Sequence, residues 1–227
     1  DAFPGPLAEL VAMGGAAGDQ SRQPARQRVG VGLRHDHARI RDQRRDIAHV
    51  FEDLRAAMPL LERETGQAQY HFLGESSGAL RAGAFAMAEP GRVWRLVLTA
   101  PTYTGKGSPT LAKRAEQVDY FRTHNRRLRD RAMIESIFTR DRPGTTDPGV
   151  AAAVADMELV HGDTVPTGTY LDMTANLPVI DPLRIAAPVA VVRGEHDGIA
   201  SMEDLWEFFE KLPNGDKQFL VIGNAAH

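Results

Sequence analysis

Residues 72–80 read Phe-Leu-Gly-Glu-Ser-Ser-Gly-Ala-Leu and contain the pattern Gly-x-Ser-x-Gly, with Ser76 at its centre. An apolar run, Tyr70 to Leu73, precedes the pattern, and a run of small residues, Ala79 to Ala88, follows it. This order predicts a strand, a sharp turn and a helix. In such a turn the serine oxygen projects out of the sheet. We expect both flanking positions to be glycine because strand and helix crowd them.

A plainer interpretation of the same stretch is a glycine-rich turn in which Ser76 only caps the following helix. A five-residue motif also arises by chance, so its structural context has to decide between the two interpretations. The discriminating context is a set of further parallel strands, with a base and an acid placed after two of them.

The composition fits one domain, or one domain that carries an insertion. The chain has 227 residues and a net charge of −3, which gives no overall attraction to nucleic acid or to an anionic membrane. It contains no cysteine, which excludes disulfides and thiolate chemistry, and no apolar run long enough to span a bilayer. We therefore expect no nucleic-acid partner and no membrane partner. The lack of cysteine does not choose a compartment, and we assign a cytoplasmic location as an expectation. The composition does not indicate an oligomeric state.

The N-terminal segment carries two features with both a functional and a plain interpretation. Residues 21–45 are rich in arginine but lack interleaved aromatic residues, which favours a solvated surface over a nucleic-acid site. The run His35-Asp36-His37 places two imidazoles on one face of a strand, but no third ligand follows at a suitable spacing, so we expect no metal. Within the arginine-rich segment, just before His35, the run Val29 to Leu33 predicts a short strand.

Helices and strands alternate on both sides of the serine motif. Apolar residues recur at helical spacing in one segment before it: Ile47, Val50, Phe51, Leu54, Met58 and Leu61. Pro59 is expected to kink or split this helix, and Gly66 to end it. Strands are predicted over 69–73 and 94–100. This alternation predicts an α/β fold with a mostly parallel, doubly wound sheet and helices on both faces.

The pattern changes over residues 108–184, where helical segments predominate and no strand is predicted. Alternation resumes with a buried-type strand at 189–192, a helix capped by Ser201 with Asp204 at its third position, and a last strand at 218–222. We divide the chain into a first core part (1–107), a helical cap inserted between two strands (108–184) and a second core part (185–227).

Three polar residues follow successive strands of this sheet: Ser76, Asp197 and His227. The carboxyl ends of parallel strands lie along one edge, so these residues can meet in space. A serine hydroxyl becomes nucleophilic when a base takes its proton, histidine titrates near neutral pH, and a carboxylate orients the imidazole. The order Ser, Asp, His is that of the nucleophile-elbow hydrolases.

At these residues the chain resembles the α/β-hydrolase family, specifically its cap-bearing, serine esterase-like members. The resemblance covers 42–100 and 188–227. It implies Ser76 as nucleophile, His227 as general base, Asp197 as the orienting acid and the backbone N–H of Ser77 as an oxyanion donor, with no cofactor. Glu195, two residues before Asp197, is the alternative acid.

The second oxyanion donor is the part of the family pattern that fits least well. The nearest candidate is Phe3, in Asp1-Ala-Phe-Pro-Gly5, where the family often has His-Gly. The strands that normally precede this loop are expected to be missing, either from the sequence given or from the protein.

The resemblance implies hydrolysis of a carboxylic ester, or a related acyl bond of a small-molecule substrate, through an acyl-enzyme. Two alternatives stay open: hydrolysis of a thioester, amide, lactone or carbon–carbon bond on the same triad, and a non-catalytic, ligand-binding relative. Four residues are candidates for the substrate pocket, although such residues more often serve packing. They are Tyr103, Met157, Tyr170 and Met173.

Overall fold

The structure is a computed structural model that describes residues 46–227, with the backbone alone for His49 and Val50. Several sequence predictions lie outside the described residues. They concern Phe3 as an oxyanion donor, the strand over 29–33, the His35-Asp36-His37 run and the arginine-rich segment 21–45.

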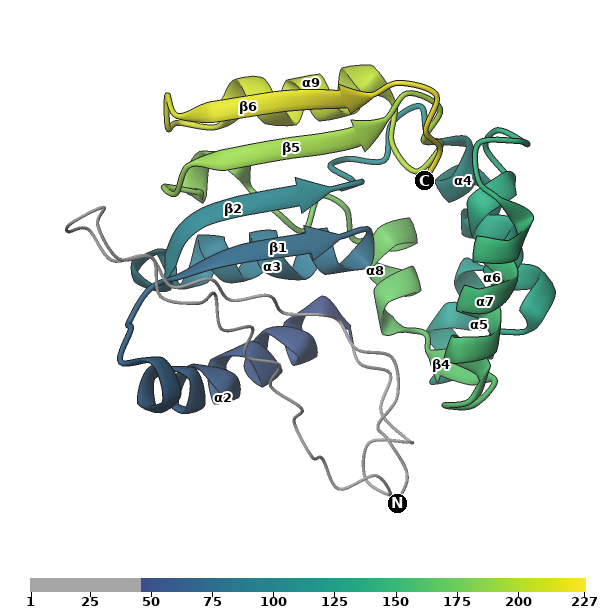
Figure 1. The fold of residues 1–227 in the computed structure, drawn as a ribbon, viewed down its shortest axis with the longest axis horizontal. Coiled ribbons are helices and arrows are strands. Elements are labelled where there is room, and N and C mark those ends of the chain that lie inside the picture. Colours follow the sequence, from purple (N-terminus) through teal and green to yellow (C-terminus); the bar gives the residue numbers. More distant parts are fainter. Residues whose placement is uncertain (1–45) are drawn as a thin grey trace.

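A four-stranded parallel sheet forms the centre of the molecule (Figure 1). Its strands are β1 (Tyr70–Glu75), β2 (Val93–Thr99), β5 (Val189–Gly194) and β6 (Lys217–Ile222), in the spatial order β1-β2-β5-β6. Every pairing in it is parallel, so all four carboxyl ends lie along one edge. The predicted α/β fold with a parallel sheet is confirmed.

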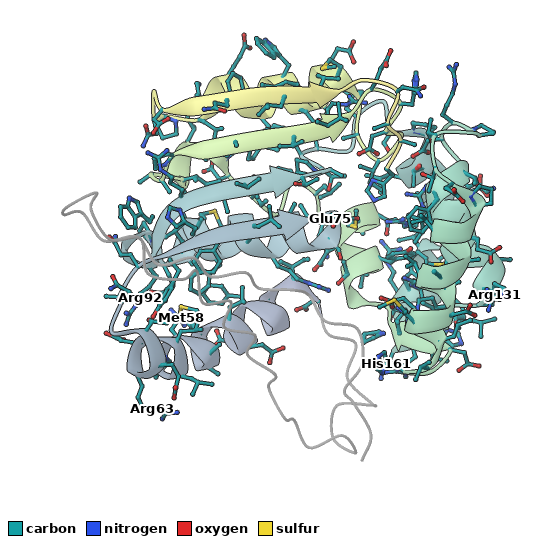
Figure 2. All side chains as sticks on the ribbon, viewed as in Figure 1. Met58, Arg63, Glu75, Arg92, Arg131 and His161 are labelled. Atoms are coloured by element: carbon teal, nitrogen blue, oxygen red, sulfur yellow. The ribbon has the colours of Figure 1, made fainter. Side chains whose placement is uncertain are left out.

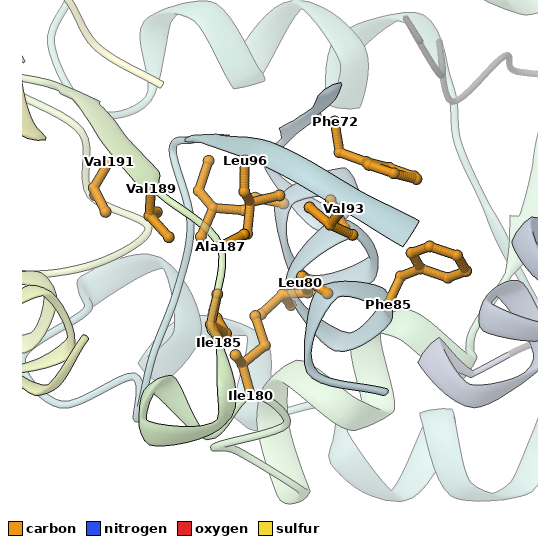
Figure 3. Close-up of a cluster of buried hydrophobic side chains, with 14 of the residues drawn as sticks. Phe72, Leu80, Phe85, Val93, Leu96, Ile180, Ile185, Ala187, Val189 and Val191 are labelled. Carbon is orange, nitrogen blue, oxygen red and sulfur yellow. The ribbon is translucent and has the colours of Figure 1, made fainter. Parts of the chain in front are cut away.

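The helices next to the serine motif bury the apolar stripe that the sequence predicts. Helix α2 (Ile47–Thr65) runs through Pro59 as one helix, so the predicted split does not occur. Gly66 ends it with a φ of +67°, a conformation that glycine adopts without strain. Helix α3 (Ser77–Ala88) packs on β1 and β2, and the ring centroids of Phe72 and Phe85 lie 5.0 Å apart in the core between them (Figure 3).

The described helices cover the sheet on one face. Phe72 on β1 contacts α3, and Phe219 on β6 contacts Phe209 of α9 (Met202–Lys211) from the same side of the sheet. On the opposite face Leu73 and Leu220 are 43% and 40% exposed. The prediction of helices on both faces is therefore wrong for residues 46–227, because the pattern in each strand reports burial and not which segment covers it.

A single buried carboxylate fixes the chain as it leaves β2. The backbone N–H of Asp204 donates to the hydroxyl of Ser201 over 3.1 Å, which is the predicted helix cap. The carboxylate of Asp204 also accepts the backbone N–H groups of Tyr103, Thr104 and Gly105. This second role ties the N-terminus of α9 to the loop after β2.

The segment between β2 and β5 folds mostly into helices. These are α4 (Pro109–Ala115), α5 (Val118–Thr123), α6 (Arg131–Thr139), α7 (Pro148–Leu159) and α8 (Gly168–Ala175). Figure 1 shows α4 to α7 standing beyond the carboxyl edge of the sheet, with α8 between them and that edge. Two short 3-10 turns, η1 (Pro90–Arg92) and η2 (Pro182–Arg184), lie next to β2 and β5 in the chain.

This segment also contains two strands, β3 (Arg126–Leu128) and β4 (Thr164–Pro166), paired antiparallel. The prediction of no strand between 108 and 184 is therefore wrong. Each strand has three residues, too few to show the alternation that marks a strand in sequence.

Candidate active site

Ser76 sits at the sharp turn between β1 and α3. Its φ of 52° and ψ of −119° lie in a region that non-glycine residues rarely adopt. Its backbone N–H donates to the carbonyl of Thr99 over 2.8 Å, which anchors the turn to β2. The side chain makes no capping hydrogen bond to α3. The interpretation of Ser76 as a mere helix cap is therefore wrong.

The two glycines of the motif differ in the space that is available for a side chain. A Cβ on Gly74 would lie 2.4 Å from the carbonyl oxygen of Gly78 and 2.7 Å from the Cα of Ala79. Gly74 is thus required by the close approach of strand and helix. A Cβ on Gly78 would meet no atom within 4 Å, so the expectation of crowding is wrong at that position.

One imidazole joins the serine to a carboxylate. The Nε2 of His227 lies 2.9 Å from the Oγ of Ser76, and its Nδ1 lies 3.0 Å from the Oδ1 of Asp197. Both distances are those of hydrogen bonds. The three side chains, which sequence analysis placed after three different strands, thus form one continuous chain of contacts at the carboxyl edge of the sheet.

The buried carboxylate of Asp197 accepts its hydrogen bonds on Oδ1, whereas its Oδ2 has no partner among residues 46–227. Asp197 is 4% exposed, and its Oδ1 also accepts the backbone N–H of Ile199 over 2.9 Å. Buried Arg193, on β5, donates from its Nε to the carbonyl of Gly194 and from its Nη2 to the carbonyl of Asp197. Sequence analysis missed Arg193, although a charged residue at the end of a buried apolar strand was an available signal.

The loop that carries His227 passes directly over the end of β5. A Cβ on Gly194 would lie 2.3 Å from the carbonyl oxygen of Ala226 and 2.6 Å from that of Ala225. The backbone N–H of His196 donates to the carbonyl of Ala225 over 2.8 Å. These backbone contacts fix the height of the imidazole above the sheet edge.

Glu195 supports the same loop and does not contact the imidazole ring in the way Asp197 does. Its Oε2 accepts the backbone N–H of Asn224 over 2.8 Å, and this hydrogen bond lowers the pKa of the Glu195 carboxyl. Asn224 has a φ of 55°, so the carboxylate stabilises a turn in the left-handed region. Of the two acids considered from sequence, Asp197 is the one that lies against His227.

Ser77 is the first residue of α3. The N–H groups in the first turn of a helix have no partner within that helix and point toward its N-terminal end. The backbone N–H of Ser77 therefore lies at the N-terminal end of α3, next to Ser76, and its role as an oxyanion donor stays a prediction. The other predicted donor, Phe3, is outside the described residues.

The four candidate pocket residues are dispersed. Met173 lines a cavity of about 570 Å³ next to α4, and Tyr170 lines a second cavity of about 490 Å³ between α5, α6 and α8. Tyr103 lines neither cavity and packs edge-on against Phe208 in the core. Met157 is 71% exposed on α7, so its predicted place in a pocket is wrong; a methionine on a helix does not reveal which face is buried.

Residues 46–227 show neither a cluster of metal ligands nor a membrane-spanning helix. No three His, Cys, Asp or Glu side chains in this part of the chain gather closely enough to hold a metal ion. None of its helices combines the length and apolar character that a bilayer-spanning segment needs.

Comparison with known proteins gives a family and a set of similar folds. A family model described as serine aminopeptidase, S33, matches residues 29–227. A monoacylglycerol lipase from Paleococcus ferrophilus is 19% identical, with a TM-score of 0.60, over 82% of this chain and 68% of the lipase. A thermophilic esterase from Thermogutta terrifontis is 20% identical, with a TM-score of 0.58, over 81% of this chain and 65% of the esterase.

An enol-lactonase from Burkholderia xenovorans is 19% identical, with a TM-score of 0.52, over 80% of this chain and 66% of the lactonase. The chain spans about two thirds of the length of these structures. Comparison with curated proteins finds no match.

Proposed function

The chain belongs to the serine aminopeptidase S33 family of α/β-hydrolases, and we propose that it hydrolyses carboxylic esters through an acyl-enzyme formed on Ser76. That it is a hydrolase of the α/β-hydrolase type follows from the family; the triad and the ester substrate are our proposal. The observation that carries it is the unbroken hydrogen-bonded chain Ser76 Oγ, His227 Nε2, His227 Nδ1 and Asp197 Oδ1.

In the first half of the reaction, the Oγ of Ser76 attacks the carbonyl carbon of the ester while the Nε2 of His227 accepts the hydroxyl proton. The carbonyl oxygen becomes an oxyanion that accepts the backbone N–H of Ser77. Asp197 stabilises the imidazolium and keeps Nδ1 protonated. The imidazolium then returns its proton to the departing alcohol oxygen as the carbon–oxygen bond breaks.

In the second half, a water molecule attacks the acyl carbon and gives its proton to the Nε2 of His227. The imidazolium then protonates the Oγ of Ser76 as the acyl–serine bond breaks, which releases the carboxylic acid. Because the same three residues serve both halves, each of their side chains is expected to be needed for turnover.

Esters are the first substrates to test because the compared structures are named as a lipase, an esterase and a lactonase, all of which cleave ester-type bonds. The family name indicates amide cleavage as the second candidate. The fold supports both kinds of reaction, so only measurement separates them.

The test combines covalent labelling with kinetics. We expect a fluorophosphonate probe to modify the wild-type protein on the peptide that contains Ser76, and p-nitrophenyl esters of increasing chain length to be hydrolysed. Ser76→Ala should lose labelling and lower kcat by about 10⁴-fold to 10⁶-fold, as removal of a serine nucleophile does elsewhere. Aminoacyl p-nitroanilides, run in parallel, measure the amide alternative.

A matched pair of histidine variants controls for nonspecific effects. His161 is exposed on the helical segment between β2 and β5, far from the sheet (Figure 2), so His161→Ala should keep the wild-type rate while His227→Ala loses it. Hydrolysis by Ser76→Ala at the wild-type rate would refute the proposed function.

A further inference from the structure

Two arginines enclose one tyrosine ring within the helical segment beyond the sheet edge. The Cζ of Arg114, on α4, lies 3.7 Å from the ring centroid of Tyr170, and the Cζ of Arg127, on β3, lies 3.6 Å from it. Two guanidinium groups this close to one centroid cannot share a face of the ring. The tyrosine is therefore sandwiched between two cations.

Neither cation has a carboxylate partner among the described residues. Arg114 donates to the Sδ of Met173 over 3.5 Å, and Arg127 to the carbonyl of Leu128 over 3.5 Å. Both contacts lie at the weak limit of hydrogen bonding. The Nε of Arg127 is fully enclosed and has no hydrogen-bond partner in this part of the chain.

Other arginines of the same segment are paired with acids. Arg129 pairs with Glu158, and Arg131 pairs with Glu135 and Asp156. The missing counter-charge at Arg114 and Arg127 is thus a local feature and not a general shortage of acids in these helices.

Partial burial of the two unpaired cations has an electrostatic cost. Desolvation is the main cause that lowers the pKa of Arg114 to about 10, and it also lowers the pKa of Arg127; in each case the charge of neighbouring arginines contributes in the same direction. Both groups stay charged at neutral pH. The tyrosine ring offsets only part of this cost, because a cation–π contact contributes less than an ion pair with a buried carboxylate.

One of the two cations, Arg127, lines a cavity of ligand size, and Arg114 contacts the tyrosine ring that forms part of its wall. The cavity of about 490 Å³ is lined by Arg127, Tyr170 and Arg140, together with the neutral donors Gln117 and Ser136. Arg140 has a partial counter-charge, since its Nε lies 3.6 Å from the Oδ1 of Asp141. Positive charge and neutral donors thus surround a space with room for a small anionic group.

Two helices, α8 and α3, lie between this cavity and the proposed nucleophile and contact each other. Tyr170 lies on α8, and its neighbour Thr169 accepts a hydrogen bond of 3.1 Å from the Nη2 of Arg81. Arg81 lies on α3, the helix that begins directly after Ser76. Figure 2 shows Glu75, at the carboxyl end of β1, close to α8, whereas Arg131 lies on the outer side of the cap.

We propose that the cavity beside Tyr170 binds an anionic oxygen group, a carboxylate or a phosphate, at the end of the substrate that is remote from the scissile bond. The inference rests on the proposed function and specifies its substrate class as esters that carry a second, negatively charged group. A bound anion pairs with Arg127 and supplies the counter-charge that the chain lacks, while Arg114, against the same ring, adds to the positive charge nearby. A cationic group, such as the amino terminus of a peptide, is repelled by the same cavity.

The kinetic test compares two esters of equal length, p-nitrophenyl hexanoate and the mono-p-nitrophenyl ester of hexanedioic acid. We expect wild type to prefer the acidic ester in kcat/KM by about tenfold or more, the worth of a charge-assisted hydrogen bond. Arg127→Met should lower kcat/KM for the acidic ester by about tenfold, mainly through KM, and change the neutral ester by less than about threefold. Arg127→Lys keeps a charge and should retain part of the preference.

Arg131→Met is the matched control, because Arg131 is an exposed arginine of the same cap and is paired with acids. It should leave the preference unchanged. If Arg127→Met fails to fold by circular dichroism, the lysine variant and Arg114→Gln carry the same test. Equal kcat/KM for the two esters in wild type would overturn the inference.

A binding measurement separates this inference from the proposed function. Calorimetry on Ser76→Ala with hexanedioate, inorganic phosphate and neutral hexanediol should show binding of at least one anion and no binding of the diol. The stronger anion identifies carboxylate or phosphate as the group recognised. Absence of binding by both anions would overturn the inference even if esters are hydrolysed, whereas anion binding without Ser76-dependent hydrolysis would refute only the proposed function.

Discussion

The charged side chains at the carboxyl edge of the sheet and beside Tyr170 differ in the partners that the chain gives them. At the sheet edge, the Oδ1 of Asp197 accepts hydrogen bonds from His227 and from the backbone N–H of Ile199, although its Oδ2 has no partner in the described part of the chain. Beside Tyr170, Arg127 in the cavity wall and Arg114 against the same ring have only the ring and two weak acceptors. The difference indicates that the first site is preorganised by the chain itself, whereas the second is completed by a ligand.

The largest expected effect on activity comes from changing the carboxylate at the sheet edge. We expect Asp197→Asn to lower kcat for ester hydrolysis by about 10⁴-fold, because the neutral amide no longer stabilises the imidazolium that forms on His227. The folded structure should persist, since the amide oxygen can still accept the N–H of Ile199. Steady-state kinetics measure the loss, and a melting temperature near that of wild type shows that folding is intact.

The backbone of the serine turn is tested by paired glycine variants. Gly74→Ala places a Cβ 2.4 Å from a carbonyl oxygen, so we expect the free energy of unfolding to fall by about 3 kcal/mol or more. Gly78→Ala meets open space and should change it by less than about 0.5 kcal/mol. Urea denaturation measures both. Equal effects of the two variants would contradict the steric account of the turn.

Arg193 shows how a cation behaves when the chain does supply its acceptors. Arg193→Met removes donors to the carbonyls of Gly194 and Asp197; the Gly194 oxygen keeps the backbone N–H of Asp197, whereas the Asp197 carbonyl loses its side-chain donor. We expect unfolding free energy to fall by about 2 kcal/mol, with a lower kcat because the loop that holds Asp197 shifts. Chemical denaturation and ester kinetics on the same preparation check the two effects together. A normal kcat in a destabilised protein would mean that Arg193 supports only the fold.

The last variant, Arg127→Met, is expected to raise the stability of the protein, whereas the variants above lower activity or stability. Arg127→Met removes an uncompensated, partly buried cation from the cavity, so we expect the ligand-free protein to gain about 1 kcal/mol of stability. For a chain of this length that corresponds to a rise of about 2 to 4 °C in melting temperature. Arg131→Met, which removes a paired surface arginine, should give no rise. A fall in the melting temperature of Arg127→Met would show that the cation is compensated by a group within the protein.

The parts of the molecule that could be predicted are those encoded by neighbouring residues. The glycine before Ser76, the cap at Ser201 and the end of α2 at Gly66 depend on sterics and hydrogen bonds within a few positions. Strands β1, β2, β5 and β6 were also predictable, because each is long enough to show its apolar pattern. The assignment of 108–184 as a separate cap unit stays a prediction.

Other features could not be read from the sequence because they depend on the path of the chain through space. The pairing of β3 with β4 joins two three-residue segments with no periodic signal. The carboxylate of Asp204 was predicted at a helix cap, but its contacts to the loop after β2 depend on how α9 lies against that loop. Met157 was predicted to line a pocket but is exposed, because a residue type alone does not indicate which face of a helix is buried.

The sequence by itself determined the parallel sheet and the order in which a serine, an acid and a histidine follow its strands, because strand periodicity and turn sterics act between near neighbours. The tertiary structure alone decided that Arg114 and Arg127 close on the two faces of Tyr170. Three separate elements meet there, and long-range packing, which no local pattern records, sets their distances.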